Sequence, residues 1–269
     1  MKGMQPILFE LGPLTVYSYG VFVVLGFGVA AAVAYLLAKQ AGLPRRRISD
    51  YLLASGLGGL LGARLWYLAL RPEDAGSFWN WFAIGGGRLA LAGGIAGGLA
   101  GLLAVIRWQR GVQGTGDRTG STWRWLDIAA IAALAGLAAG RIGSLLNGDF
   151  LGTQTSLPWS IGYADQLASL VEGVRVHPLA LYAAVLYAAI AVYGYRLWKL
   201  GAAGKAKPGL VFWVTAFLLG IVQVVLEAWH QSEEALFVGG IRAAVATGLI
   251  LMGISLYVLV RRYRVGLAK

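Results

Sequence analysis

Residues 14–38 read LTVYSYGVFVVLGFGVAAAVAYLLA and contain no charged side chain. A helix needs about 20 predominantly apolar residues to cross the hydrocarbon core of a bilayer. This stretch therefore predicts a membrane span. Gln5, Pro6, Glu10 and Pro13 precede it. They do not form the short apolar core and small-residue exit of a cleavable signal peptide, so we expect the first span to remain in the mature protein.

The whole chain has the composition of a membrane protein. Hydrophobic residues make up 58% of the 269 residues and charged residues 13%, against roughly 45–50% and 25% in soluble domains. No polar linker divides the chain, so we predict one transmembrane helical domain over residues 1–269. This all-α, polytopic fold has about seven transmembrane helices. We expect the other six spans near 51–70, 89–106, 126–146, 178–195, 209–228 and 239–260.

Glycine is unusually frequent, with 40 residues. Small residues between membrane helices let two backbones approach closely, and lipid offers the backbone no alternative to the helix. The third expected span contains AGGIAGGLAGLLA at residues 92–104. We interpret it as a helix packed closely against a neighbour.

The basic residues are distributed unevenly between the two sides of the membrane. One alternating set of loops holds only Lys2, Arg71, Arg88 and Arg175. The other set holds sixteen of the 23 lysines and arginines: Lys39, Arg45, Arg46, Arg47, Arg107, Arg110, Arg118, Arg124, Arg196, Lys199, Lys205, Lys207, Arg261, Arg262, Arg264 and Lys269. Because cytoplasmic loops are rich in lysine and arginine, we predict an outside N-terminus and a cytoplasmic C-terminus. The net charge of +11 is thus topological, and we expect no nucleic-acid partner.

Cysteine is absent and there are only two histidines, His177 and His230. The absence of cysteine excludes disulfides and a cysteine nucleophile in this chain, so any reacting thiol comes from a substrate. The two histidines lack the short spacing of many zinc sites. We predict neither a metal site nor a cofactor.

Five charged residues fall within the expected spans. Charges at membrane depth cost about 2.5–3.5 kcal/mol each on insertion scales, which makes them candidates for function. They are Arg64, Asp127, Arg141, Glu227 and Arg242. Asp127 and Arg242 lie near the ends of their spans, where the simpler interpretation is that they reach the membrane surface.

Arg64 and Arg141 lie deeper, both in the outer half of an even-numbered span. If the two helices adjoin, the guanidiniums form a positive pocket suited to a lipid phosphate. The alternative is that they pair with Glu227, Asp149 or backbone carbonyls and only fasten the bundle. Position alone leaves both interpretations open.

Polar and glycine residues follow Arg141 at the end of the fourth span. Asn147 and Asp149 offer hydrogen-bonding groups, and Gly148 and Gly152 permit bends or close approach to a ligand. This pattern fits the mouth of a cavity. It also fits a polar helix end with a glycine cap.

The segment AGRIGSLLNGDFLG at residues 139–152 resembles the signature of the bacterial prolipoprotein diacylglyceryl transferase family, Gly-Arg-x-Gly-Asn-Phe-x-Asn-x-Glu-x-x-Gly. Other blocks are similar to the family in the same order along the chain. They are FELGPLTVYSYGVFVVLGF at 9–27, LGARLWY at 61–67, LAGGIAGG at 91–98, RVHPLALY at 175–182 and Glu227 in the sixth span.

The resemblance implies transfer of a diacylglyceryl group from phosphatidylglycerol to the lipobox cysteine of a prolipoprotein, at the outer face of the bacterial plasma (inner) membrane. It implies that Arg141 stabilises charge on the departing glycerol phosphate. It also implies a lipid site lined by Tyr19, Arg64, Asn147, Gly152 and Glu227. The phosphate-bearing lipid and the thiol of the partner agree with the interpretation of the residues themselves.

Four positions depart from the family pattern. Ala92 stands where the family has a histidine proposed as the base, Ser144 where it has asparagine, Asp149 where it has glutamate, and Gln223 where it has arginine. A general base is typically worth about 10²–10⁴ in rate. His177 and His230 are the only histidines that could supply a base in its place. We take His177 as the candidate catalytic base, beside the alternative that it merely caps the helix that begins near Pro178.

Two functions from different classes follow. The first is an active diacylglyceryl transferase that acts on phosphatidylglycerol and a prolipoprotein. The second is a catalytically degenerate member of the family, a lipid-binding structural subunit of a membrane assembly with partner proteins. We favour the enzyme because seven residues of the family pattern occur together: Tyr19, Arg64, Arg141, Asn147, Gly152, His177 and Glu227.

Overall fold

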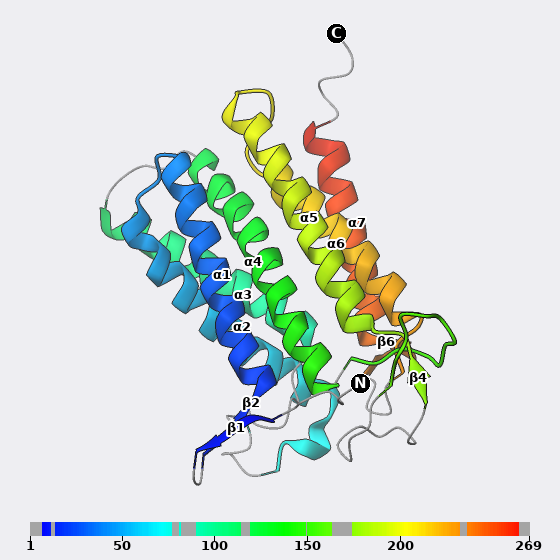
Figure 1. Ribbon diagram of the computed structural model, residues 1–269. Coiled ribbons are helices and arrows are strands. Elements are labelled where there is room, and N and C mark those ends of the chain that lie inside the picture. Colours follow the sequence, from blue (N-terminus) through cyan, green and yellow to red (C-terminus); the bar gives the residue numbers. More distant parts are fainter. Residues whose placement is uncertain are drawn as a thin grey trace.

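A computed structural model describes residues 7–11, 14–76, 81, 90–113, 119–148, 150–162, 174–231 and 236–263. Within these residues it is a bundle of seven long helices (Figure 1). They are α1 (Ser18–Gln40), α2 (Ile48–Leu70), α3 (Leu91–Gln113), α4 (Thr119–Asn147), α5 (Leu179–Ala202), α6 (Leu210–Glu227) and α7 (Ala243–Tyr263). Each is long and apolar enough to cross a membrane, which confirms the predicted all-α fold with seven spans.

Short elements connect the helices. Two 3₁₀ turns, η1 (Arg45–Arg47) and η2 (Pro72–Asp74), lie on either side of α2. Three antiparallel two-stranded hairpins join β1 (Ile7–Leu11) to β2 (Leu14–Tyr17), β3 (Ile161–Gly162) to β4 (Arg175–Val176) and β5 (Phe237–Val238) to β6 (Ile241–Arg242).

Two predicted span boundaries were wrong because apolar residues before the helix form strands. Residues Leu14–Tyr17 pair with Ile7–Leu11, so α1 begins at Ser18 rather than at residue 14. Gly239 and Gly240 have φ angles of 57° and 81° and turn the β5–β6 hairpin, so α7 begins only at Ala243. Hydropathy cannot separate a short apolar strand from the first turn of a helix.

The two ends of the bundle differ in structure and charge (Figure 1). The three hairpins lie at one end, which we call the hairpin end. The opposite end, the basic end, carries the described members of the sixteen basic loop residues. Arg118, Arg264 and Lys269 are outside the described residues, as are Lys2 and Arg88 of the opposite set.

Glycines set the spacing of three helix pairs, α2 with α3, α1 with α4, and α6 with α7. A Cβ added to Gly97 of α3 would lie 2.2 Å from the carbonyl oxygen of Gly58 in α2. In the other two pairs the contacts are between Gly26 and Gly136 and between Gly220 and Gly248. A Cβ on the first glycine of each of these pairs would lie 2.7 Å and 2.6 Å from the carbonyl oxygen of the second. Any larger residue would force these helices apart, so the expected close packing of residues 92–104 is confirmed.

Asp127 is buried against the start of α6, and its reach to the membrane surface stays a prediction. Its residue is only 5% exposed, and its carboxylate accepts hydrogen bonds from the backbone N–H groups of Gly209 at 2.7 Å and Phe212 at 2.8 Å. These donors belong to the start of α6, where N–H groups have no partner within the helix. Asp127 of α4 therefore caps α6, 82 residues further along the chain.

The glycine contacts predict that Gly97→Ala destabilises the bundle by about 1–3 kcal/mol, because the new methyl group meets a backbone carbonyl that cannot rotate away. Thermal unfolding in detergent measures the change. Gly253→Ala on α7 is the matched control, since nothing lies within 4 Å of a Cβ there. Equal melting temperatures for the two variants would contradict the account of helix packing.

Candidate active site

An extended segment after α4 joins three helices at the hairpin end. The N–H of Gly152 donates to the carbonyl of His177, and the N–H of His177 donates to the carbonyl of Thr153, both at 3.1 Å. On the other side, the N–H of Thr153 donates to the carbonyl of Trp229 at 2.8 Å, and Gly152 forms a β-bridge with His230. The two histidines, far apart in sequence, therefore lie on either side of Gly152.

There is no room for a side chain at Gly152. An added Cβ would lie 2.6 Å from the Cβ of His177 and 3.0 Å from its carbonyl oxygen. Gly148 ends α4 with a φ of 75°, in the left-handed region that suits glycine. The glycines of the signature thus let the chain turn out of α4 and run close beside the start of α5.

Arg141 lies in the last part of α4 with its guanidinium against two aromatic rings. Its Cζ is 4.3 Å from the centre of the Phe150 ring and 5.8 Å from the centre of the Tyr187 ring. Among the described residues, no hydrogen bond or ion pair engages this guanidinium; Asp149 is outside them. The rings stabilise the cation while its N–H donors stay available to a ligand.

Glu227 lies at the end of α6, is 9% exposed and uses both of its carboxylate oxygens. Oε1 accepts a hydrogen bond from Arg242 at 3.1 Å, and Oε2 lies 3.2 Å from Nδ1 of His230. Arg242 also donates to the carbonyl of His230 at 2.7 Å. The expectation that Arg242 only reaches toward the surface was wrong, because it pairs with Glu227. Glu227 in turn binds these two partners, and no contact pairs it with Arg141.

Phe150 connects the two groups of charged residues. Its ring centre lies 4.6 Å from the imidazole of His230, and the same ring faces Arg141. The sequence analysis named His230 only as one of two histidines available as a base, and it did not single out Phe150. The only available signal was their position, two residues after Gly148 and three after Glu227.

His177 is held by a neighbouring tyrosine. Its Nδ1 lies 3.3 Å from the hydroxyl of Tyr182, which accepts a hydrogen bond from the indole N–H of Trp159 at 2.7 Å. Pro178 is the N-cap of α5, and no side chain caps this helix. The carbonyl of His177 accepts a hydrogen bond from the N–H of Leu179, the first residue of α5, at 2.9 Å, so its role at the helix start and its role as a base both stay predictions.

Arg64 is buried in α2 with its Cζ 5.6 Å from the ring centre of Tyr67. The hydroxyl of Tyr67 donates to Asp74 of η2. Arg64 shares the hairpin half of the bundle with Arg141, but different rings face the two guanidiniums, and α2 packs mainly on α3 whereas α4 packs on α1 and α5. A lipid site common to both arginines stays a prediction.

Tyr19 and Asn147 lie near the same end of α4. Tyr19 is in the first turn of α1, where its Cα would be 3.4 Å from a Cβ on Gly143. Asn147 is the half-buried last residue of α4. The structure therefore gathers Tyr19, Arg141, Asn147, Gly152, His177 and Glu227 around the end of α4 and the segment that follows it.

The described residues that could ligate a metal do not gather in groups of three or more histidines and acidic residues. Glu227 and His230 form one pair. The carboxylate of Glu227 binds His230 and Arg242, and Arg242 also binds the carbonyl of His230.

Comparison with known proteins places this arrangement in a family. Residues 6–261 match the sequence model of the family described as Prolipoprotein diacylglyceryl transferase. The chain belongs to this family. A protein of Geobacter sulfurreducens is 28% identical, with 98% of each chain covered, and one of Legionella pneumophila (strain Lens) is 30% identical, with 93% of this chain and 90% of the other covered. Both are named phosphatidylglycerol–prolipoprotein diacylglyceryl transferase.

The predicted family membership is thus confirmed. Together with seven helices able to span a membrane, the bacterial relatives make the chain a multi-pass protein of a bacterial plasma membrane. A third relative, from Solidesulfovibrio magneticus, carries the same name and is 30% identical, with 83% of this chain and 80% of its own covered.

The three described positions that depart from the family pattern carry no charge. Ala92 is the half-buried second residue of α3. Ser144 and Gln223 are both 6% exposed, and Nε2 of Gln223 has no hydrogen-bond partner among the described residues. Gln223 lies one helical turn before Glu227, so the cation nearest to that carboxylate comes from Arg242 of a different element.

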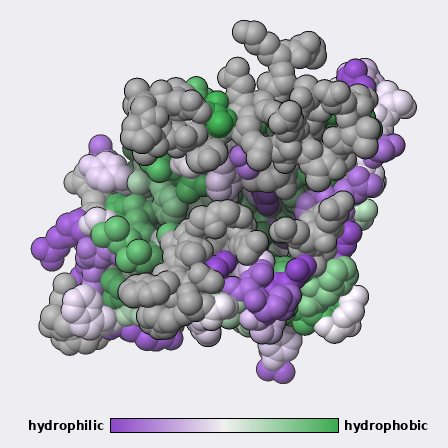
Figure 2. All heavy atoms as spheres, turned by 90° about the horizontal axis from the view of Figure 1, so that it is seen from below, coloured by the Kyte–Doolittle hydropathy of each residue, from purple (hydrophilic) through white to green (hydrophobic). Residues whose placement is uncertain are grey.

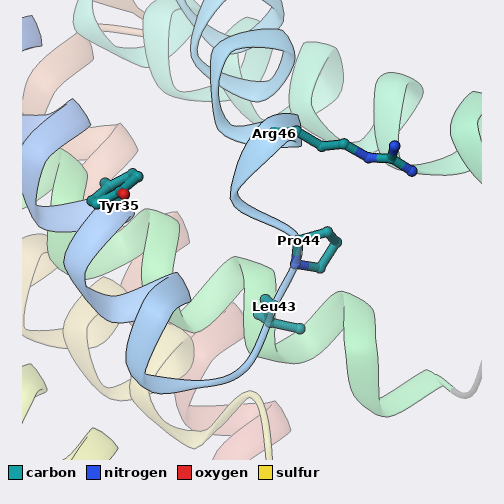
Figure 3. A pocket seen from close by; sticks show the side chains of 4 residues that line it. All are labelled: Tyr35, Leu43, Pro44 and Arg46. Atoms are coloured by element: carbon teal, nitrogen blue, oxygen red, sulfur yellow. The ribbon is translucent and has the colours of Figure 1, made fainter.

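Two hollows lie apart from this cluster. The larger, of about 620 Å³, is at the basic end and is lined by Tyr35, Leu43, Pro44 and Arg46 (Figure 3). The side chain of Arg46 points away from Tyr35 there, and the described residues that line this hollow include no histidine, aspartate or glutamate. The smaller, of about 220 Å³, has an apolar lining at the hairpin end of α2: Leu65, Leu68, Ala69, Pro72, Ala75 and Trp81. Figure 2 shows the bundle from the hairpin end, where hydrophilic and hydrophobic residues lie side by side on the surface.

Proposed function

We propose that this protein transfers the diacylglyceryl group of phosphatidylglycerol to the lipobox cysteine thiol of a prolipoprotein. The observation that carries the proposal is the guanidinium of Arg141, which lies close to two aromatic rings without an anionic partner in the described part of the chain. The named activity of the relatives supplies both substrates, the lipid and the protein thiol.

Arg141 is the group that binds the lipid phosphate in this proposal. The planar guanidinium donates two parallel hydrogen bonds to phosphate oxygens, a geometry that lysine cannot provide. In the reaction, a C–S bond forms between the thiol sulfur and the diacylglyceryl carbon, and the bond from that carbon to the phosphate oxygen breaks. The electron pair leaves with glycerol phosphate. Arg141 accelerates this step because it binds the developing charge more strongly in the transition state than in the ground state.

The other site residues shape the lipid site. Tyr19 and Asn147 place polar groups beside the end of α4, and Gly152 lets the chain run close beside His177. Arg64 precedes Leu65 and Leu68 in α2, which line the apolar hollow at the hairpin end, where an acyl chain is a suitable occupant. Glu227 fixes His230 and Arg242. His177 stands across Gly152 as a wall of the site or as its base.

The proposed chemistry takes place at the outer face of the membrane. The hairpin end holds the cluster around Arg141, and the basic end is cytoplasmic by the positive-inside rule. In this orientation, a lipid from the outer leaflet and a prolipoprotein exported across the membrane reach the same end of the bundle.

Two observations favour a second function. Ala92 cannot accept a proton, and Gln223 is buried without a bonding partner among the described residues for its Nε2. A protein that has lost activity in this way would remain a lipid-binding structural subunit, which acts together with partner proteins of a membrane complex.

We expect the purified protein to transfer labelled lipid from phosphatidylglycerol vesicles to a lipobox peptide. Arg141→Lys should lower the rate by roughly 10²-fold, since it keeps the charge but loses the planar pair of donors. Arg46→Lys, the same substitution in the hollow at the basic end, should leave the rate unchanged. Lipid binding without any transfer by the unaltered protein would instead support the structural subunit, and an undiminished rate for Arg141→Lys would assign the phosphate to another group.

The orientation is tested with a fluorescent protein that matures only in the cytoplasm. A fusion after Lys269 should fluoresce, and an insertion between Ser156 and Leu157 at the hairpin end should not, because the basic end is retained inside. Fluorescence from the insertion alone would reverse the proposed orientation and place the site at the cytoplasmic face.

A further inference from the structure

The two histidines beside Gly152 differ in which ring nitrogen is free to accept a proton. Neutral imidazole has one N–H donor and one acceptor nitrogen, and the partners of the ring decide which is which. Nδ1 of His177 faces the hydroxyl of Tyr182, whereas Nδ1 of His230 faces the carboxylate of Glu227. These partners have opposite effects on the acceptor.

At His177 the acceptor nitrogen is already occupied. The indole N–H of Trp159 can only donate, so the oxygen of Tyr182 accepts that hydrogen bond. The O–H of Tyr182 then has Nδ1 of His177 as its one acceptor among the described residues. When this O–H donates to Nδ1, the proton of the neutral imidazole lies on Nε2, and the lone pair on Nδ1 is bound by the tyrosine.

At His230 the acceptor nitrogen is available. A carboxylate only accepts hydrogen bonds, so Nδ1 carries the proton and donates to Oε2 of Glu227. Nε2 then bears the lone pair, and it has no hydrogen-bond partner within the described part of the chain. This is the arrangement in which a carboxylate fixes the tautomer of a histidine that acts as a base.

The Glu227 carboxylate is itself held in place. Its other oxygen binds Arg242, and Arg242 also donates to the carbonyl of His230. Three bonds therefore fix the backbone and the ring of His230 relative to the end of α6. The side chain of His230 is 16% exposed, which shields the ring from bulk solvent yet leaves part of it accessible.

His230 also lies close to the proposed phosphate site. Its ring centre is 4.6 Å from the ring centre of Phe150, and the Cζ of Arg141 is 4.3 Å from the same centre. The imidazole and the guanidinium are therefore separated by no more than the sum of these two distances. A lipid whose phosphate binds Arg141 brings its reacting carbon within reach of a thiol beside His230.

We infer that His230 is the base that removes the proton from the substrate thiol, and that Glu227 is its positioning residue. The inference rests on the proposed function. The S–H bond of the lipobox cysteine breaks, its proton moves to Nε2 of His230, and the thiolate attacks the diacylglyceryl carbon. The glycerol phosphate leaves with the electron pair of the C–O bond, and the imidazolium then gives its proton to that phosphate or to water.

The charges around His230 favour this proton transfer. Glu227 of α6 faces the ring directly and stabilises the imidazolium, while Arg242 before α7 balances the carboxylate in the resting state. Arg141 of α4 lies beyond Phe150, and His177 lies across Gly152. The base thus comes from the end of α6, which accounts for how Ala92 on α3 is tolerated.

The test compares the unaltered protein with His230→Asn and His230→Ala in the lipid transfer assay. The amide of Asn keeps a donor for Glu227 but has no basic nitrogen, so we expect a loss of about 10²–10⁴ in rate at an unchanged melting temperature. The rate of His230→Asn should follow ionisation of the thiol, whose pKa is near 8.5, whereas the unaltered protein should depend less steeply on pH. Added imidazole should restore transfer by His230→Ala, and Lys205→Ala at the basic end should transfer normally.

His177→Ala provides the comparison within the site. It should lower transfer without any recovery on addition of imidazole, because His177 fixes the wall beside Gly152 and does not accept the proton. Equal rates for His230→Asn and the unaltered protein, or rescue of His177→Ala alone, would overturn the inference while the proposed function stands. No transfer by the unaltered protein would refute the proposed function and the inference with it.

Discussion

Contacts between glycine backbones determine how close the helices of this bundle lie. Lipid chains are as apolar as leucine, so membrane helices gain no hydrophobic energy from leaving them and associate through close packing instead. In three helix pairs a single methyl group on a glycine would meet a carbonyl oxygen at 2.2 to 2.7 Å. The α1–α4 pair in particular positions the end of α4, from which Arg141 and the segment around Gly152 follow.

The two buried carboxylates of the bundle show how a buried charge is accommodated. Asp127 binds the free N–H groups of α6, and Glu227 binds Arg242 and His230. Burying a charge without such partners costs roughly several kcal/mol of free energy, even after the surrounding protein relaxes. Arg141 differs because its described contacts are ring faces, which leave its donors to a ligand. This contrast, rather than burial alone, separates the structural charges from the one that we assign to the lipid.

Much of the fold, and the place of Arg141 near the end of α4, could be predicted from the sequence because hydropathy and charge are local properties. The partners of Asp127 and Arg242 could not, since nothing in the sequence relates α4 to the start of α6 or β6 to Glu227. The same holds for Phe150 and His230, which meet only because Gly152 and its neighbours form a strand between two distant segments. The signature pointed to Arg141, but the contacts of the two histidines could be seen only in the structure.

The central claim is that Arg141 holds the phosphate of the lipid substrate, and the most direct measurement is a structure of the protein in nanodiscs of phosphatidylglycerol. The account predicts a headgroup at the hairpin end, with two phosphate oxygens at roughly 2.7–2.9 Å from two guanidinium nitrogens of Arg141. A headgroup bound elsewhere, for example in the hollow beside Arg46, with no lipid phosphate near Arg141, would contradict it.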